Sequence, residues 1–172
     1  QRITVVDDAA PALAGVPADA TVSCDAIPGP AAVSASDACD PNPIVGLAET
    51  VEPGGCPQER TITRTWTATD ACGNASSASQ TVVVEDNTAP SLTLTPAASP
   101  IECPLTPSFP APTVSDACDP APVVTFSDAT TPGTCAQEYS VTRTWTATDA
   151  CGNASSASQT VVVEDNTAPS LT

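Results

Sequence analysis

The sequence predicts an all-β protein made of tandem immunoglobulin-like β-sandwich domains joined end to end. The first observation is an internal copy, because residues 63–93 recur letter for letter as residues 142–172. A copy of this length indicates a repeated domain. The second is a series of short alternating segments rich in Thr and Val, which are typical of strands. The third is the 19 Pro residues, which interrupt any helical period.

The repeat extends beyond the identical stretch. A shift of 79 positions superimposes every cysteine of the first copy on one of the second, and it also carries residues 37–41 onto residues 116–120. Residues 1–11 align with residues 80–90, so the chain begins inside the last strand of a repeat. We therefore expect four parts: 1–7 as the last strand of a preceding repeat, 8–86 as repeat 1, 87–165 as repeat 2, and 166–172 as the start of a following repeat. We interpret the chain as one segment of a continuous array of such repeats.

Each repeat is expected to contain six strands, placed by the alternation of its side chains. In repeat 1 they are Leu13–Gly15, Ala20–Cys24, Ala31–Ser36, Pro43–Thr50, Arg60–Thr69 and Ala75–Glu85. Along the fifth strand, Ile62, Trp66 and Ala68 share one face, and five Thr residues share the other. We expect Trp66 in the core and the Thr face in solvent. Arg64 falls on the core side, so we place it at the sheet margin, paired with Glu59, with a solvated Arg near the pole as the alternative.

The order of these strands favours a reduced immunoglobulin-like sandwich whose last three strands form one sheet. This topology places the turns 37–42 and 70–74 together at one pole, called here the entry pole. It places Cys24 and Cys56 together at the opposite, exit pole. The pairs inferred from this placement, which is one of three connectivities for four cysteines, are Cys24–Cys56, Cys39–Cys72, Cys103–Cys135 and Cys118–Cys151.

The composition excludes several classes of function. The 172 residues include four Arg, no Lys and no His against 20 acidic residues, giving a net charge of −16. Nucleic acid and anionic membranes are therefore poor partners, and no apolar run is long enough for membrane insertion. Eight cysteines in domains this small predict an oxidising, extracellular compartment. Without His or Lys, no base is evident for a nucleophilic Ser, so we expect no enzyme.

The motif TWTATDACGN at residues 65–74, followed by a Val-rich strand and by DNTAP at residues 86–90, resembles hyalin-repeat (HYR-like) and bacterial immunoglobulin-like modules. The resemblance covers both repeats. It implies non-catalytic sandwiches arranged in tandem in large secreted or cell-surface bacterial proteins, including adhesins. It also implies calcium bound by Asp residues at the junctions. Two features depart from the pattern: Thr is missing from residues 7–11, and Cys72 lies inside the turn.

Acidic and amide side chains gather at the entry pole of each repeat, and they make it a candidate Ca²⁺ site. Ca²⁺ takes six to eight oxygen ligands, and so many carboxylates at one pole repel one another without a cation. The alternative is that they only form turn hydrogen bonds. The candidate ligands are Asp7, Asp8, Asp37, Asp40, Asp70 and Asn74 for repeat 1, Asp86, Asn87, Asp116, Asp119, Asp149 and Asn153 for repeat 2, and Asp165 at the end of repeat 2.

Other chemistries fit the residues less well. Zinc sites need close ligand pairs, and the chain has no CxxC and no His. Isopeptide cross-links need Lys. A Thr–Gln ester through Gln58 or Gln80 stays formally open, as does glycosylation of the Asn74-Ala75-Ser76 sequon. The Thr face of the fifth strand suits a soluble outer surface, with ice or carbohydrate binding as its alternative.

We therefore expect an extracellular structural repeat: a disulfide-locked, calcium-stiffened stalk, fibre or adhesin shaft, on the surface of a bacterium. Its partners would be neighbouring repeats, in one long chain or in a head-to-tail filament. The competing expectation is an adhesive module that binds a surface glycan or a protein. A binding tip should carry clustered aromatic side chains, and Phe109, Phe126 and Tyr139 are the main departures of repeat 2 from repeat 1.

Overall fold

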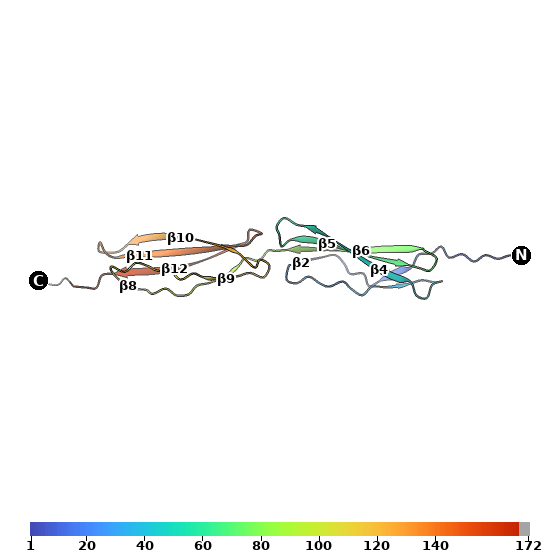
Figure 1. Ribbon diagram of the computed structural model, residues 1–172, viewed down its shortest axis with the longest axis horizontal. Helices are drawn as coiled ribbons and strands as arrows, with labels where there is room; N and C mark the ends of the chain where they lie inside the picture. The colour runs from blue at the N-terminus through green and yellow to red at the C-terminus, as the bar shows by residue number, and fades with distance from the viewer. Residues whose placement is uncertain (169–172) are drawn as a thin grey trace. The chain divides into compact units, whose positions relative to one another are not determined.

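A computed structural model describes residues 1–168. The chain divides into two compact units, unit 1 (Gln1–Asp86) and unit 2 (Asn87–Thr172). Regular structure in the described residues consists of strands only (Figure 1), and they include no helix long and apolar enough to span a membrane. The expected division into residues 1–7, 8–86, 87–165 and 166–172 stays a prediction, and residues 169–172 of its last part lie outside the described residues.

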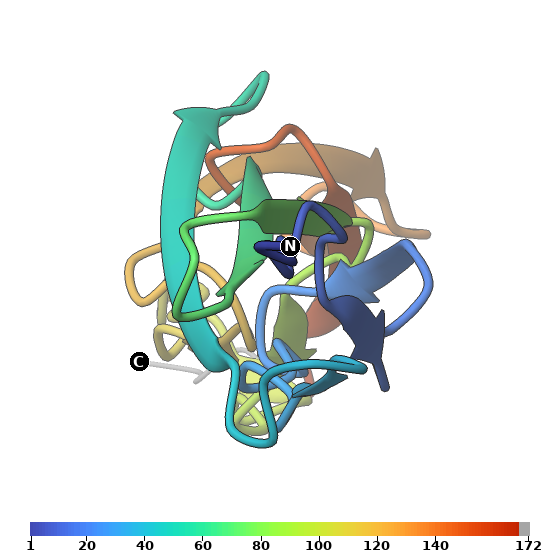
Figure 2. The ribbon, with the colours of Figure 1, turned by 90° about the vertical axis from the view of Figure 1, so that its right-hand side faces the viewer.

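Unit 1 is a four-stranded sheet with a smaller two-stranded sheet. The four-stranded sheet has the order β2-β6-β5-β4, with β2 (Ala20–Ser23), β6 (Ala75–Glu85), β5 (Arg60–Thr69) and β4 (Ile44–Pro53). The short strands β1 (Ala12–Ala14) and β3 (Ser34–Ser36) pair with each other. In Figure 2 the blue segment that carries β1 lies to one side of the cyan-to-green strands β4–β6. The result is the reduced sandwich that the strand order predicts.

Unit 2 repeats this plan strand by strand. Its larger sheet has the order β10-β11-β12-β8, and its smaller sheet pairs β7 with β9. The bounds are β7 Ser91–Thr93, β8 Ile101–Glu102, β9 Thr113–Ser115, β10 Val123–Pro132, β11 Tyr139–Thr148 and β12 Ala154–Glu164. Each repeat therefore places the same segments at the same poles.

The directions of the strands agree with the expected topology. β4 and β6 both run antiparallel to β5, so the last three strands form one sheet as predicted. β2 adds to that sheet by parallel pairing with β6. The turn 70–74 after β5 and the loop 54–59 before it therefore lie at opposite ends of β5, which separates the entry pole from the exit pole.

The core of each unit comes from the inner face of the two central strands of its larger sheet. In unit 1 the buried residues on β5 and β6 include Ile62, Trp66, Ala68, Val82 and Val84. In unit 2 their counterparts Trp145, Ala147, Val161 and Val163 are buried as well. The alternation of β5 is therefore confirmed, since its Thr residues face outward and are at least partly exposed. Thr65 on this outer face shares a 3.0 Å hydrogen bond with the Ser79 hydroxyl.

The placement of Arg64 corrects the expectation from the sequence. Arg64 is buried, with 3% of its surface exposed, rather than at the sheet margin. Its partner is Glu49 and not Glu59: the Arg64 Nε atom lies 2.9 Å from the Glu49 Oε2 atom. The reason is the register, because Glu49 on β4 stands directly opposite Arg64 on β5. Glu59 instead accepts a hydrogen bond from the Gly55 amide.

Candidate metal centre and neighbouring groups

The turn that follows β5 is held by the side chain of its first residue. Asp70 Oδ1 accepts hydrogen bonds from the amides of Cys72 (2.9 Å) and Asn74 (2.8 Å), and Asp70 Oδ2 accepts one from the Asn74 side chain (2.8 Å). Gly73 has a φ of 91°, which glycine adopts without steric cost. Burial raises the pKa of Asp70, but the hydrogen bonds from Asn74, Cys72 and Gly73 outweigh it and lower that pKa.

The turn 37–42 is built in the same way and joins its neighbour. Asp37 Oδ1 accepts hydrogen bonds from the amides of Cys39 (2.8 Å) and Asp40 (3.0 Å). Asp40 Oδ1 accepts one from the Asn42 amide, and its Oδ2 accepts one from the amide of Ala71 in the other turn (2.9 Å). One carboxylate therefore connects the two turns of the entry pole.

Asp7 completes the group of carboxylates in unit 1. The Asn74 side chain donates a 3.1 Å hydrogen bond to the backbone oxygen of Asp7. Ligand atoms of Asp7, Asp37 and Cys39 lie within 4.8 Å of one another. The charge of Asp7, burial and Asp37 raise the pKa of the Cys39 thiol. These contacts bring five of the six residues predicted for repeat 1 to one pole. The sixth, Asp8, is exposed.

The carboxylates of the entry pole differ in what they can offer a cation. Asp70 and Asp40 use both oxygens in turn hydrogen bonds, which is the structural role that was the alternative to metal binding. Asp37 holds its turn through Oδ1. Its counterpart Asp116 does the same in unit 2, and its Oδ2 is a buried carboxylate oxygen with no hydrogen-bond partner among the described residues. An anionic oxygen buried in this way fits a bound cation.

Unit 2 reproduces both turns with nearly the same distances. Asp149 Oδ1 accepts from the amides of Cys151 (2.9 Å) and Asn153 (2.8 Å). Asp119 Oδ2 accepts a 2.9 Å hydrogen bond from Ala150. Burial raises the pKa of Asp149, whereas the hydrogen bonds from Asn153 and its neighbours prevail and lower it. Asp86, the counterpart of Asp7, is 2% exposed and ends unit 1, and Asn87 begins unit 2.

A second acidic group lies at the exit pole of unit 2. Ligand atoms of Glu102, Cys103 and Asp165 lie within 4.8 Å of one another. Glu102 also accepts a 2.6 Å hydrogen bond from the Asn166 amide. Asp165 was a predicted ligand, whereas Glu102 was missed because repeat 1 has Ser23 at that position. Its signal was an acidic residue immediately before Cys103, in a strand that pairs with residues 163–164.

The cysteines fall into two groups of four. Cys24, Cys56, Cys118 and Cys151 are disulfide-bonded. Cys39, Cys72 and Cys135 are exposed thiols, and Cys103 is a partly buried one. Burial, followed by the charges of Asp7 and Asp70, raises the pKa of the Cys72 thiol. The four pairs that the strand order favours stay predictions.

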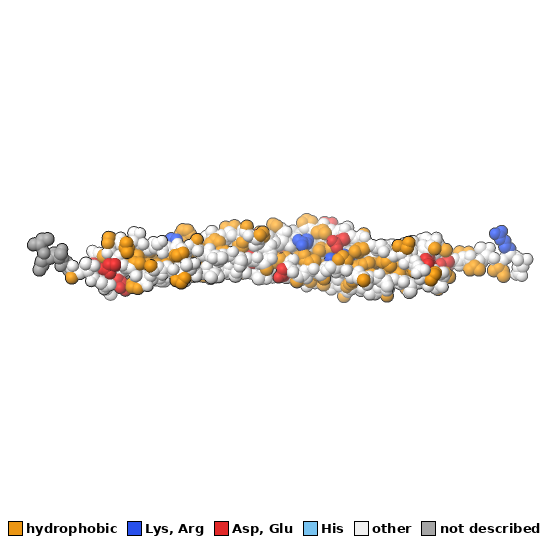
Figure 3. Space-filling model, turned by 60° about the horizontal axis from the view of Figure 1, so that its bottom comes forward, with side chains coloured by type: hydrophobic (Ala, Val, Ile, Leu, Met, Phe, Trp, Pro, Cys, Tyr) orange, Lys and Arg blue, Asp and Glu red, His pale blue; other side chains and the backbone are white. Residues whose placement is uncertain are grey.

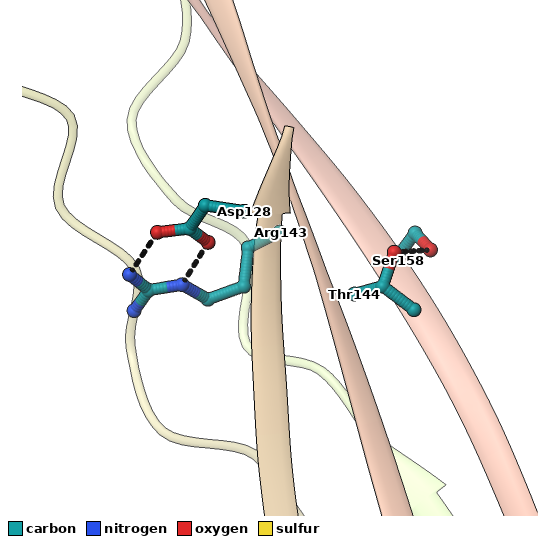
Figure 4. Close-up of polar contacts among 4 residues, drawn as sticks. All are labelled: Asp128, Arg143, Thr144 and Ser158. Carbon is teal, nitrogen blue, oxygen red and sulfur yellow. Dashed lines mark hydrogen bonds and ion pairs between the residues drawn. The ribbon is translucent and has the colours of Figure 1, made fainter. Parts of the chain in front are cut away.

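Unit 2 also carries an aromatic group around Arg143. The guanidinium carbon lies 4.0 Å from the ring centre of Phe126 and 4.7 Å from that of Phe109. Asp128 holds the same guanidinium through two hydrogen bonds of 2.7 Å (Figure 4). Trp145, 3% exposed, lines a pocket of about 280 Å³ together with these rings. Phe126 is 60% exposed.

This aromatic group distinguishes the two units. In repeat 1 the counterparts of Phe109 and Phe126 are Pro30 and Leu47, so the rings are absent. In Figure 4 the Asp128–Arg143 pair lies on one side of the sheet, and Thr144 and Ser158, whose hydroxyls are 2.8 Å apart, lie on the other. On the face drawn in Figure 3, acidic side chains lie in small groups among uncharged and hydrophobic ones.

A family model described as an HYR-like domain with four cysteines matches residues 13–84 and 92–163. No curated protein matches the chain significantly. Among solved structures, a PcdhgB3 EC1–4 fragment is 14% identical with a TM-score of 0.39, covering 93% of this chain and 50% of that one. A Drosophila N-cadherin EC1–4 fragment is 13% identical with a TM-score of 0.38, covering 91% and 50%. The chain thus spans about half the length of these structures.

Proposed function

Because this chain belongs to the family of HYR-like domains with four cysteines, we propose that it is an extracellular structural module of the adhesion type, forming two consecutive repeats of a stalk or adhesin shaft. The observation that carries this proposal is the reproduction of one architecture in both units. Strand order, register and the turn networks of Asp70 and Asp149 recur at a constant spacing. Repeats of this kind contact mainly their neighbours, so their number sets the length of a shaft.

The finer part of the proposal is that Ca²⁺ at the entry pole stiffens the array. Support comes from the convergence of Asp7 and Asp37 and from the buried, unpartnered Oδ2 atom of Asp116. Asp70 and Asp40 would then form the scaffold that orients the turns, since their oxygens are engaged in hydrogen bonds. Ca²⁺ suits such a site because it is a hard cation that prefers carboxylate oxygens.

A thermal melt and a scattering curve, each recorded with Ca²⁺ and with EGTA, test the metal part. We expect Ca²⁺ to raise the melting temperature and to lengthen the particle, because a ligand that binds only the native state stabilises it. Asp37→Asn should remove most of the effect of Ca²⁺ on unit 1. Asp8→Asn is the matched control, since Asp8 is an exposed neighbour that lies outside the group of Asp7, Asp37 and Cys39. Equal melting temperatures in Ca²⁺ and EGTA for the wild type would refute calcium stiffening.

A second candidate function, glycan binding, is favoured by the aromatic group of unit 2. Exposed rings stack on the apolar faces of sugars, and the pocket beside Phe126 and Arg143 has both an apolar wall and a polar edge. Titration of surface polysaccharides while following Trp fluorescence tests it, because Trp145 lines this pocket. Phe126→Leu, which installs the residue of repeat 1, should abolish the response. Binding that survives this change would refute the assignment of the pocket.

A further inference from the structure

The strand β10 forms an open edge of the larger sheet of unit 2. It stands at the end of the order β10-β11-β12-β8 (Figure 1), and among the described strands it pairs only with β11. In an antiparallel pair, every second residue directs its backbone N–H and C=O away from the neighbouring strand. All ten residues of β10 are exposed. A row of backbone donors and acceptors therefore faces solvent, and a further strand can add to it.

Large apolar side chains accompany this row of backbone groups. Val123, Val124 and Phe126 are all exposed. Val124 and Phe126 lie two positions apart on one face of the strand and line the pocket beside Arg143. A strand added to β10 would cover part of this apolar surface and would also satisfy the open backbone groups. The edge thus offers both the hydrogen bonds and the apolar contact that strand addition uses.

The charges of β10 allow it to pair with a second copy of itself. Its single charged side chain is Asp128, and Arg143 neutralises that carboxylate through two hydrogen bonds of 2.7 Å. In a two-fold antiparallel pair, each strand meets the same residues on its partner. Uncompensated like charges would then oppose one another, and β10 brings none to the contact. Gly is absent from the strand, and its only Pro is the last residue, Pro132.

The equivalent edge strand of unit 1, β4, is protected against the same pairing. It has the same length and also ends its sheet, but it carries Glu52 in place of Thr131 and Gly46 in place of Thr125. Glu52 is exposed, and a charged side chain on an edge strand is a common protection against edge-to-edge association. A glycine inside a strand weakens its pairing. Only the edge in unit 2 is therefore suited to self-association.

We propose that β10 is a self-association surface, on which the β10 strands of two copies pair antiparallel about a two-fold axis near Ser127. This position of the axis lies at the middle of the strand, so the whole of Val123–Pro132 takes part. The two four-stranded sheets then become one continuous sheet. β10 runs between the poles of unit 2, so this contact goes beyond the proposed shaft function: it holds two shafts side by side.

The contact should be reversible and should depend on concentration. A single pair of strands is smaller than a standard protein interface of about 1,600 Å², so we expect a dissociation constant between micromolar and millimolar. Sedimentation of the full chain over this range, in EDTA, measures it. The mean mass should rise with concentration from 17.1 kDa toward twice that value.

A matched pair of variants tests the role of the edge. Ser127→Lys places a cation beside its own copy across the two-fold axis, and it should raise the dissociation constant by about tenfold or more. Ser127 is exposed, so circular dichroism of this variant should match that of the wild type. Ala48→Lys makes the same change at the equivalent position of β4, and it should leave the dissociation constant unchanged.

Hydrogen exchange locates the contact without any variant. Amides of β10 should become more protected as the concentration rises, whereas those of β4 should not. A wild-type chain that stays monomeric up to millimolar concentration, equal association of wild type and Ser127→Lys, or protection of β4 in place of β10 would overturn the proposal. Dimers that persist on a denaturing gel without reductant would overturn it as well, because they would be disulfide-linked. EDTA is present throughout, so the outcome does not depend on calcium stiffening.

Discussion

The buried ion pair of unit 1 gives a sharp test of how the sheet is held together. Arg64 is 3% exposed, its Nε atom bonds Glu49, and its Nη1 atom is already buried with no hydrogen-bond partner among the described residues. Changing Glu49 to Ala would remove the carboxylate that pairs with the buried guanidinium. Removing one member of a fully buried pair costs about 3–5 kcal/mol.

The expected loss of unfolding free energy is smaller for this pair than for a fully buried one. The Glu49 side chain is 39% exposed, so water reaches the gap that the substitution leaves. We therefore expect Glu49→Ala to reduce the free energy of unfolding of unit 1 by about 2 kcal/mol, near the value of a charged hydrogen bond. For a domain of this size, that loss lowers the melting temperature by roughly 10 °C. Calorimetry measures the shift, and hydrogen exchange of the β4 and β5 amides assigns it to unit 1.

Two further variants separate the ion pair from other effects. Glu52→Ala removes an exposed acidic side chain from the same strand and should change the melting temperature little. A double variant, Glu49→Leu with Arg64→Leu, should recover part of the lost stability, because apolar side chains can replace a buried pair at little cost. If Glu49→Ala is no more destabilising than Glu52→Ala, the reasoning from burial is wrong.

Two further predictions concern turns and loops. Asp70→Asn should lower the melting temperature at neutral pH. The pKa of Asp70 is below its ordinary value of 3.8, so its stabilisation is present above that pH and is lost as the pH falls through the lower folded value. Melting curves of both proteins should therefore converge in acid, and a constant gap would contradict this. Gly54→Ala should cost about 1–3 kcal/mol in urea unfolding, because an added Cβ would lie 2.5 Å from the Cβ of Glu59. Gly29→Ala is the control, since its Cβ would meet nothing within 4 Å, and equal costs would argue against the clash.

Two of the three long strands of repeat 1, β5 and β6, were predictable because their alternation is strong, whereas β4 is Ile44–Pro53 rather than the expected Pro43–Thr50. β5 and β6 match the expected segments residue for residue, since inward-facing and outward-facing residues alternate along their whole length. The short strands were less accurate: β3 is Ser34–Ser36 rather than Ala31–Ser36. Strands of three residues bury little, so pairing with a neighbour decides their limits, and a single sequence does not show that pairing.

The candidate site was predictable in its position but less so in the role of each residue. Strand order alone brought the two turns together, and Asp40 does bridge them. The sequence did not show that both carboxylate oxygens of Asp70 accept hydrogen bonds within its own turn. Residues that stabilise a turn and residues that bind a metal are of the same types, so the sequence does not tell them apart. The partner of Arg64 was missed because it depends on the register between β4 and β5, which places Glu49 opposite Arg64. Glu59 is nearer in the sequence but does not lie opposite Arg64.

The hairpins β5–β6 and β11–β12 are nearly identical in sequence, so a strand of one repeat could pair with the wrong strand of the other during folding. β5 could pair with β12 as well as with β6, since β12 has the same sequence. Proximity settles the choice, because the short turn 70–74 closes with a smaller loss of chain entropy than the long segment up to β12, by roughly 2.5 kcal/mol. The short turn 70–74 thus also favours pairing within one repeat over the exchange of strands between the two duplicated domains while they fold.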